Sequence, residues 1–312
     1  METELKGLFA AVYTPFDKEK RLNLDVLEKQ ARKLVADGII GVFICGTTGE
    51  GLHLTKEERK LVAEKWAEVG SGFGLKVIVH VGHTSQKDAI DLAKHASGLN
   101  VFGVASIVPG FHKADKPKSA VETLKPIADA CPNKHFFYYH IPMLTGIPLE
   151  AYPILEYGLK KIPNMKGVKF TDTNLLDFVK CLSLKKDGLV SFWGVDAVLL
   201  SALALGCRSA IGSTYNYAGP LHQIIWNSFE RGDLVEAAKY TQKAVRLVGL
   251  LKRFGLIGAG KAIMNMVGID VGPPRPPNFP LDENERNEVY NELEKLGLVE
   301  LLGLLKPGGL EK

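Results

Sequence analysis

The chain has 312 residues, of which 46% are hydrophobic, and 39 Lys and Arg set against 35 Asp and Glu give a formal net charge of +4. This length and apolar content suffice for a large core and exclude a disordered chain. Basic and acidic residues are interleaved, as in Lys56-Glu57-Glu58-Arg59-Lys60, so no basic stripe is present and we expect no nucleic-acid partner.

Eight short apolar runs typical of β-strands follow one another along the chain. They span Leu8–Val12, Gly41–Cys45, Lys76–Val81, Gly103–Val108, His135–Tyr139, Met165–Phe170, Val190–Trp193 and Ser209–Gly212. The segments between them have helical spacing, and Thr55-Lys56-Glu57-Glu58 fits a capping box that would start one of the helices. Eight alternations of strand and helix predict an α/β fold in which a parallel sheet closes into a (β/α)8 TIM barrel.

The window from Gly188 to Cys207 has the length of a membrane span and carries Asp196 as its one charge. Gly194-Val195-Asp196 offers a turn and a helix cap inside it, so we divide it into a strand, Val190–Trp193, and a helix, Ala197–Leu205. The sequence therefore predicts no membrane partner.

Beyond the eighth run the strands stop and the sequence becomes helical. Helices are predicted over Asp233–Phe254, Ala259–Val267 and Leu281–Leu296, with residues 272–277 as a stiff proline-rich connector and Gly297 just past the last helix. We thus predict two parts, a catalytic barrel over residues 1–232 and a C-terminal helical extension over residues 233–312.

Features of the amino terminus and of the cysteines indicate the compartment. The first six residues show no basic segment followed by an apolar core, so we expect no secretory signal. The four cysteines, Cys45, Cys131, Cys181 and Cys207, are widely spaced and form no Cys-x-x-Cys pair. We therefore expect free thiols and a cytoplasmic protein.

Lys169 ends the apolar run Met165–Phe170 and precedes the polar stretch Thr171–Asn174. A lysine at the end of a buried strand loses hydration, which lowers its pKa and leaves an amine that can attack a ketone. A lone lysine at a strand end more often extends its ammonium to solvent, so the neighbouring motifs decide between the two interpretations.

Two such motifs also follow strand-like runs, and all three would meet at one rim of the barrel. Gly46-Thr47-Thr48-Gly49-Glu50-Gly51 supplies hydroxyls and backbone amides that can hold a carboxylate, or it is an ordinary turn before the helix that starts near Thr55. Tyr139 can move protons beside Lys169, although tyrosine also favours strands for structural reasons. Tyr138 should point the opposite way.

At these motifs the chain resembles the pyruvate-dependent class I aldolases, the family of N-acetylneuraminate lyase and dihydrodipicolinate synthase. The runs Tyr139-His140-Ile141-Pro142, Gly167–Thr173 and Gly212–Asn216 are similar to the animal N-acetylneuraminate lyase type, and the resemblance covers nearly the whole chain. It implies reversible cleavage of N-acetylneuraminate (sialic acid) to pyruvate and N-acetylmannosamine through a Schiff base, without cofactor or metal, in a homotetramer.

The resemblance also implies residue roles. Lys169 would form the imine, Tyr139 would be the proton donor, and Thr47 and Thr48 would bind the carboxylate derived from pyruvate. The positions that would contact the sugar-derived chain are Thr171, Gly194, Asp196 and Ser213. Asp196 can equally cap the helix that follows it.

Two departures from the sialic acid lyases keep other functions open, and a third position argues against one of them. Ala197 stands where the sialic acid lyases usually carry Glu, and residues 108–113 lack the tyrosine that some relatives lend to a neighbouring subunit. Leu144 stands where dihydrodipicolinate synthases place an arginine, and an apolar side chain cannot hold a second carboxylate. The alternatives are an aldolase for another 2-keto-3-deoxy sugar acid, a dihydrodipicolinate synthase-like enzyme, or an inactive barrel that senses sugar acids.

Two further patterns resemble known sites but lack required residues. Residues 255–262 nearly fit a phosphate loop, but Ala262 replaces the Ser or Thr that would reach magnesium. His80 and His83 are neighbours without a matching carboxylate, so a catalytic metal is unsupported.

Overall fold

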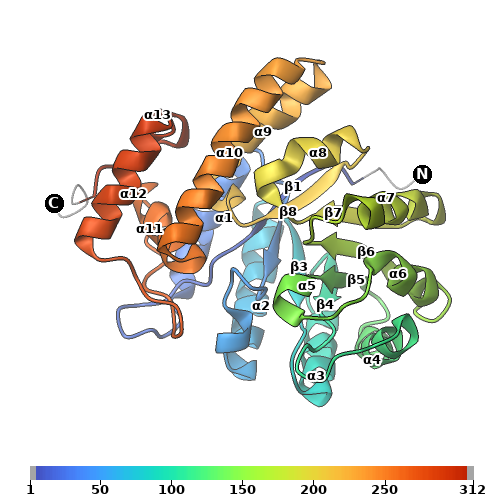
Figure 1. Ribbon diagram of the computed structural model, residues 1–312. Helices are drawn as coiled ribbons and strands as arrows, with labels where there is room; N and C mark the ends of the chain where they lie inside the picture. The colour runs from blue at the N-terminus through green and yellow to red at the C-terminus, as the bar shows by residue number, and fades with distance from the viewer. Residues whose placement is uncertain (1–4, 308–312) are drawn as a thin grey trace.

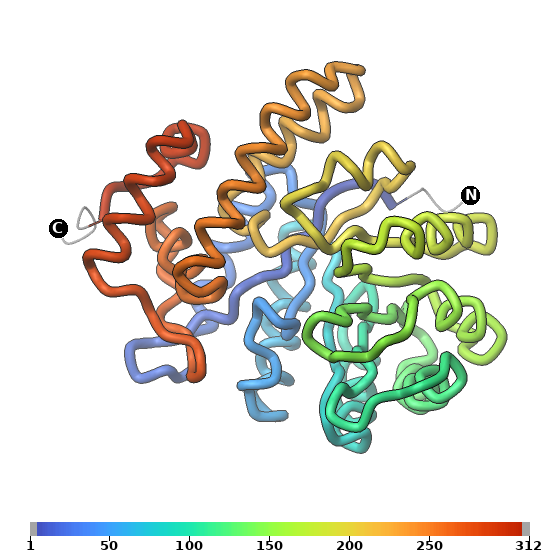
Figure 2. Tube along the Cα trace, viewed as in Figure 1, coloured from blue at the N-terminus to red at the C-terminus, as the bar shows by residue number. Residues whose placement is uncertain are grey.

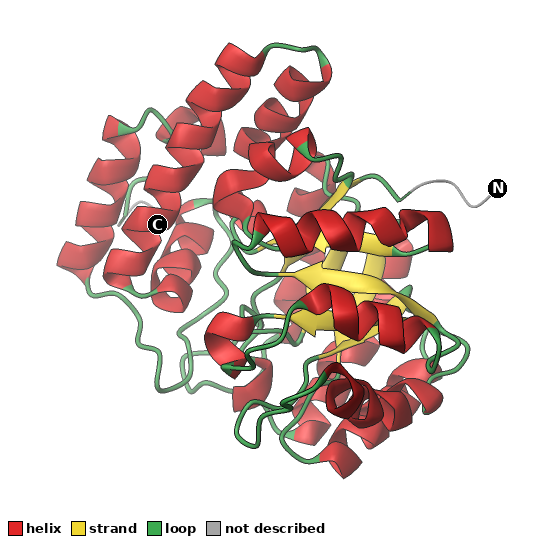
Figure 3. Ribbon diagram, turned by 45° about the vertical axis from the view of Figure 1, so that its right-hand side comes forward, coloured by secondary structure: helices red, strands yellow, loops and turns green. Residues whose placement is uncertain are grey.

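The computed structural model describes residues 5–307, and a closed barrel of eight parallel strands lies at its centre (Figures 1 and 3). Each strand pairs with its neighbours in the sequence, and β1 closes the barrel against β8. The strands are β1 (Gly7–Ala11), β2 (Gly41–Ile44), β3 (Lys76–His80), β4 (Gly103–Ser106), β5 (His135–His140), β6 (Met165–Phe170), β7 (Val190–Trp193) and β8 (Ser209–Gly212). The prediction of a TIM barrel is confirmed.

A helix follows each strand and covers the outside of the barrel (Figure 3). These helices are α1 (Leu27–Ala36), α2 (Lys56–Gly72), α3 (Gln86–Ser97), α4 (Pro117–Asp129), α6 (Ala151–Leu159), α7 (Leu175–Ser183), α8 (Leu199–Ala204) and α9 (Tyr215–Glu230). One short helix, α5 (Pro142–Thr145), and four 3-10 turns, η1 (Leu24–Val26), η2 (Gly51–His53), η3 (Leu184–Asp187) and η4 (Asp196–Val198), lie in the connections. The capping box predicted at Thr55 and Glu58 is present at the start of α2.

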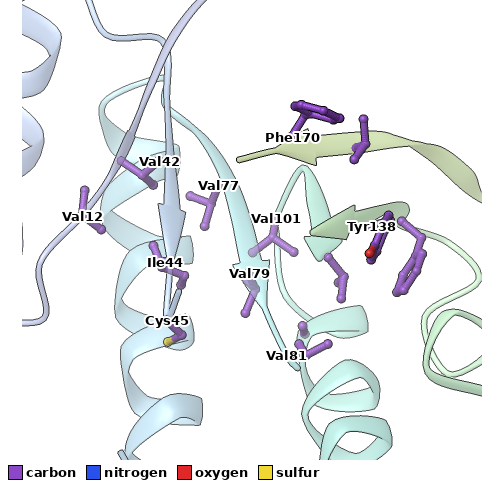
Figure 4. Packing of buried hydrophobic residues seen from close by; sticks show 14 of the residues in the cluster. Val12, Val42, Ile44, Cys45, Val77, Val79, Val81, Val101, Tyr138 and Phe170 are labelled. Atoms are coloured by element: carbon purple, nitrogen blue, oxygen red, sulfur yellow. The ribbon is translucent and has the colours of Figure 1, made fainter. Parts of the chain in front are cut away.

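Alternation along the strands separates two apolar layers, because successive side chains of a strand point to opposite faces. Phe9, Phe43, Phe137 and Phe192 belong to the cluster that fills the barrel interior. The side chains between them pack outward against the helices, and Figure 4 shows part of this layer, including Tyr138. Tyr138 thus points away from the barrel interior, as the sequence predicts.

The chain continues into α10 (Leu234–Phe254), α11 (Leu256–Met266), α12 (Glu283–Lys295) and α13 (Val299–Leu302). These helices, orange to red in Figure 2, lie together on one side of the barrel and share an apolar cluster with α9 and Tyr13. Helix α11 starts at Leu256 rather than at Ala259, so residues 256–262 of the stretch that resembles a phosphate loop are helical. Helix α13 was not predicted.

The apolar window from Gly188 to Cys207 forms β7, η4 and α8, which divides it at the expected turn. The expected single helix from Ala197 to Leu205 is instead a 3-10 turn followed by a short α-helix. Within residues 5–307 no helix is long and apolar enough to cross a membrane. All four cysteines are buried free thiols.

Candidate active site

The carboxyl ends of the strands bring the predicted site residues to one rim of the barrel, because all eight strands run in the same direction. Tyr139 and Lys169 lie on the neighbouring strands β5 and β6 and are paired in register. The other predicted residues lie at or just beyond the ends of β2, β6, β7 and β8: Thr47, Thr48, Thr171, Gly194, Asp196 and Ser213.

Lys169 points into the barrel and is 5% exposed. Its Nζ lies 3.9 Å from the ring centroid of Phe43 and 4.2 Å from that of Tyr139. Burial lowers the pKa of Lys169 to about 7, and the negative charge of Asp196 opposes this shift. A substantial fraction of this amine is therefore unprotonated at neutral pH, as a nucleophile requires.

Tyr139 forms one wall beside this amine, and its hydroxyl lies 3.4 Å from Oγ1 of Thr47. Burial raises the pKa of Tyr139, while the hydroxyls of Thr47 and Thr171 oppose the rise. The phenol therefore carries its proton at neutral pH. The ring packs edge-on against Phe43 and His80, with centroids 5.4 Å and 5.7 Å apart, which fixes its orientation.

The turn after β2 brings Thr47 and Thr48 to the rim in a tight backbone loop. The amide of Gly51 donates to the carbonyl of Gly46 at 3.0 Å, and a Cβ at position 51 would lie 1.8 Å from the carbonyl oxygen of Cys45. Only glycine fits at this position. Thr47 is exposed at the rim, whereas Thr48 is buried.

The carboxylate of Asp196 is largely engaged by the protein itself. Its Oδ2 accepts from the amide and the hydroxyl of Thr214, both at 2.8 Å, and from Ser213 Oγ at 3.4 Å. Its Oδ1 accepts from the amide of Ala197 at 3.1 Å and from no amide of the second or third residue of the following turn. Asp196 therefore ties β7 to the loop after β8 and does not cap the next helix in the expected way.

Gly194 and Thr171 lie against each other at the ends of β7 and β6. The amide of Gly194 donates to the carbonyl of Phe170 at 2.7 Å, and a Cβ at position 194 would lie 2.1 Å from Oγ1 of Thr171. Glycine is required here because any side chain would displace the threonine hydroxyl.

A cavity of about 540 Å³ opens at this rim and is large enough for a small-molecule ligand. Its walls include Thr47, His80, Tyr139, Leu144 and Asn278. Lys169 lies against the Tyr139 wall of this cavity, whereas Asp196 and Ser213 lie outside its lining on the β7–β8 side. The predicted nucleophile Lys169 and proton donor Tyr139 therefore lie at the cavity, whereas Asp196 and Ser213, two of the predicted sugar contacts, lie beside it.

Sequence reasoning missed two neighbours of the reactive amine. Phe43 follows from the alternation Val42-Phe43-Ile44, which turns its ring inward beneath Lys169. His80 ends β3 at the same rim, where the sequence alone suggests only a metal ligand. Burial lowers its pKa to about 3, and its Nδ1 is bonded to the carbonyl of Cys45, so it is a neutral ring that supports Tyr139. Among residues 5–307 no group of three or more metal-ligating side chains is found.

Comparison with known proteins shows the family of the chain. The profile of the Dihydrodipicolinate synthetase family matches residues 4–296. The chain belongs to this family. It is 39% identical to the N-acetylneuraminate lyases of Pongo abelii and Homo sapiens, in each case over 99% of this chain and 97% of the relative. The solved structure of Proteus mirabilis N-acetylneuraminate lyase superposes with a TM-score of 0.91 at 36% identity and covers 94% of this chain and 99% of that one.

The structure locates the three positions at which the sequence differs from one branch or another of the Dihydrodipicolinate synthetase family. Leu144 lines the cavity and is 59% exposed, so an apolar wall stands at that point. Phe111 is 89% exposed on the loop after β4 and also lines the cavity. Ala197 is partly exposed in η4, beside Asp196.

Proposed function

We propose that the protein cleaves N-acetylneuraminate reversibly to pyruvate and N-acetylmannosamine through an imine on Lys169. The observation that carries this proposal is the buried amine of Lys169 over the rings of Phe43 and Tyr139, with its pKa lowered to about 7. Relatives and structural neighbours named N-acetylneuraminate lyase support the choice of substrate.

In the first half of the proposed reaction, the free amine attacks the 2-keto carbon of the open-chain sugar acid. Thr47 and Thr48 bind the adjacent carboxylate and orient the ketone. Tyr139 is protonated in the free protein because burial raises its pKa. It gives its proton to the carbinolamine hydroxyl, which leaves as water and yields the protonated imine.

In the second half, the Tyr139 phenolate takes the proton of the C4 hydroxyl while the bond between C3 and C4 breaks. The electron pair of that bond moves into the imine, so N-acetylmannosamine leaves as the aldehyde and an enamine stays on Lys169. Protonation of the enamine at C3 and addition of water release pyruvate and restore the amine. Thr171, Gly194, Asp196 and Ser213 are proposed to contact the sugar chain at this stage.

Borohydride trapping tests the covalent step. Treatment with pyruvate and borohydride should add a reduced pyruvate-derived mass to the peptide that contains Lys169. Adduct on Lys166, or no adduct at all, would contradict the mechanism, and the second result would favour an inactive barrel that senses sugar acids.

Another aldolase activity is the second candidate, because Ala197 leaves the far end of a nine-carbon sugar acid without the carboxylate usual in the sialic acid lyases. Measuring pyruvate release from a panel of 2-keto-3-deoxy sugar acids distinguishes these substrates. A dihydrodipicolinate synthase-like reaction is disfavoured, since Leu144 cannot pair with a second carboxylate.

We further propose that residues 1–232 form the catalytic barrel and residues 233–312 an extension to it, and that the protein is a cytoplasmic homotetramer. Four free thiols suit a reducing compartment. The oligomer rests on the family resemblance, and measuring the molar mass in solution by light scattering tests it.

A further inference from the structure

The turn that carries Thr47 and Thr48 has an unfavourable backbone at both ends. Cys45 has φ 55° and Glu50 has φ 53°, in the left-handed region that non-glycine residues seldom adopt. Among residues 5–307, Lys20 is the one other non-glycine residue with positive φ. Such a backbone persists only where its surroundings hold it.

The side chain of Glu50 provides one such restraint, because both of its carboxylate oxygens have partners from the C-terminal part of the chain. Glu50 is fully buried, and its Oε1 forms an ion pair with Nζ of Lys261 at 2.9 Å. Its Oε2 accepts from the backbone amide of Arg275 at 2.7 Å. Lys261 lies on α11, and its side chain is 2% exposed.

The ammonium of Lys261 also holds the other side of the turn. It donates to the carbonyl of Thr14 at 3.0 Å and to that of Pro273 at 3.3 Å. The hydroxyl of Thr14 in turn donates to the carbonyl of Gly49 at 2.6 Å. Lys261 is thus linked to two consecutive residues of the turn, Gly49 and Glu50, which directly follow Thr48.

Arg275 fixes the same region from the connector between α11 and α12. Its guanidinium pairs with Glu58 in the first turn of α2, at 2.6 and 2.7 Å, and with the carbonyl of Lys20 at 2.8 Å. Because the amide of Arg275 binds Glu50, the start of α2 and the end of the turn are anchored to the same residue.

The ion pair also changes the electrostatics of the turn. Without Lys261, the buried carboxylate of Glu50 would leave a negative charge in the loop that is proposed to bind the substrate carboxylate, and the two negative charges would repel each other. Lys261 cancels the charge of Glu50, so the turn can present its hydroxyls and amides to an anion.

We infer that Glu50 and Lys261 are positioning residues, whose buried ion pair holds the turn of Thr47 and Thr48 in the form that binds the substrate carboxylate. The inference rests on the proposed function. It makes the C-terminal helices part of the active site through a contact that does not reach the reacting atoms. Loss of the pair should therefore weaken recognition of the carboxylate and leave the reactivity of Lys169 toward a ketone intact.

Lys261→Met tests this inference with two ketones, pyruvate and acetone, of which only pyruvate has a carboxylate. Borohydride trapping at increasing ketone concentration gives a half-saturating concentration for each, read as adduct mass on the Lys169 peptide. For Lys261→Met we expect this value to rise at least about tenfold for pyruvate, in line with the effect of a small misplacement of a binding group. For acetone we expect a change of less than about twofold.

Two further variants complete the experiment. Lys243→Met removes a lysine of the same extension whose Nζ reaches the carbonyl of Gly297, and it should behave as wild type with both ketones. Glu50→Gln/Lys261→Met removes both charges, so it should recover part of the lost pyruvate affinity. Should Lys261→Met fail to fold, the double variant carries the test, with a rise of at least about threefold for pyruvate and none for acetone.

An unchanged pyruvate value in Lys261→Met, or an equal change for both ketones, would overturn the inference while leaving the proposed function in place. An absence of adduct in the wild-type protein would overturn the proposed function and the inference together.

Discussion

Two lysines are buried near the carboxyl-terminal rim of the barrel. Aromatic rings surround the amine of one, and oxygen atoms surround the ammonium of the other. The amine of Lys169 lies over two aromatic rings, 3.9 and 4.2 Å from their centroids, and within residues 5–307 it has no carboxylate in ion-pair contact. Lys261 lies against Glu50 at 2.9 Å and donates to two backbone carbonyls.

Burial lowers the pKa of both side chains, of Lys169 to about 7 and of Lys261 to about 8. In Lys261 the negative charge of Glu50 opposes the shift, and three oxygens surround the ammonium. Aromatic faces attract a cation without anchoring its hydrogens as a ring of oxygens does, so the Lys169 amine can lose its proton and turn toward a ketone. Burial alone therefore does not make a lysine reactive, and the type of neighbour decides its role.

The largest expected effect comes from replacing the reactive amine. Lys169→Arg should abolish the pyruvate adduct and the release of pyruvate from N-acetylneuraminate, because a guanidinium stays protonated and cannot form an imine. Lys166→Arg, on the same strand, should retain both. Full activity of Lys169→Arg would show that the lysine over the rings is not the nucleophile.

The next effect concerns the ring beside that amine. Tyr139→Phe should lower turnover by roughly 10²–10⁴-fold, the usual contribution of a positioned acid or base, because the ring is kept and the proton is lost. Tyr138→Phe is the matched control, since its hydroxyl points outward and contacts His140 at 3.2 Å. Steady-state kinetics of both variants decide the matter, and equal losses would contradict the assignment of Tyr139.

Replacing each of the two lysines with methionine should change the free energy of unfolding in opposite directions. At pH 6, Lys169 is a buried cation with no carboxylate in ion-pair contact among residues 5–307. Lys169→Met should therefore raise the free energy of unfolding, at most by on the order of several kcal/mol. Lys261→Met leaves Glu50 buried and unpaired, so it should lower that free energy by about 3–5 kcal/mol. Urea unfolding measures both.

The pH dependence of the Lys169→Met effect follows from the pKa. A folded-state pKa of about 7, well below the ordinary value of 10.5, means that the folded protein disfavours the protonated amine. This penalty is complete below pH 7 and declines as pH rises from 7 toward 10.5. The gain from Lys169→Met should therefore be smaller at pH 9 than at pH 6, and a gain that grows with pH would contradict a lowered pKa.

Much of the barrel and of its rim could be predicted because the signals are local. The alternation of strands and helices gives the fold, and the two-residue period of a strand separates Tyr138 from Tyr139. The capping box at Thr55 and Glu58 lies within four residues of sequence. Each of these features depends on the spacing of neighbouring residues alone.

The contacts of Glu50, Lys261 and Asp196 could not be predicted, because their partners come from distant parts of the chain. Nothing near Lys261 in the sequence indicates a buried ion pair, and the glycine-rich stretch around it only resembles an incomplete phosphate loop that lacks the Ser or Thr required at position 262. Asp196 suggested a helix cap from its local position, but Thr214 of the next unit occupies its carboxylate. The contacts of these three side chains depend on tertiary packing, which the local sequence does not reveal.

The smallest expected effect lies at Ala197, on the β7 side of the rim. A methyl group cannot bind the terminal hydroxyls of a nine-carbon sugar acid, whereas a carboxylate there adds a charge-assisted hydrogen bond of roughly 1.5–3 kcal/mol. Ala197→Glu should therefore raise kcat/KM for N-acetylneuraminate, relative to an analogue without the last two carbons, by about ten- to a hundredfold. The measurement is the ratio of kcat/KM for the two substrates in both proteins. An unchanged ratio would mean that position 197 does not face the sugar tail, and the tail would then extend toward the cavity over β2–β5, where Leu144 and Asn278 form the wall.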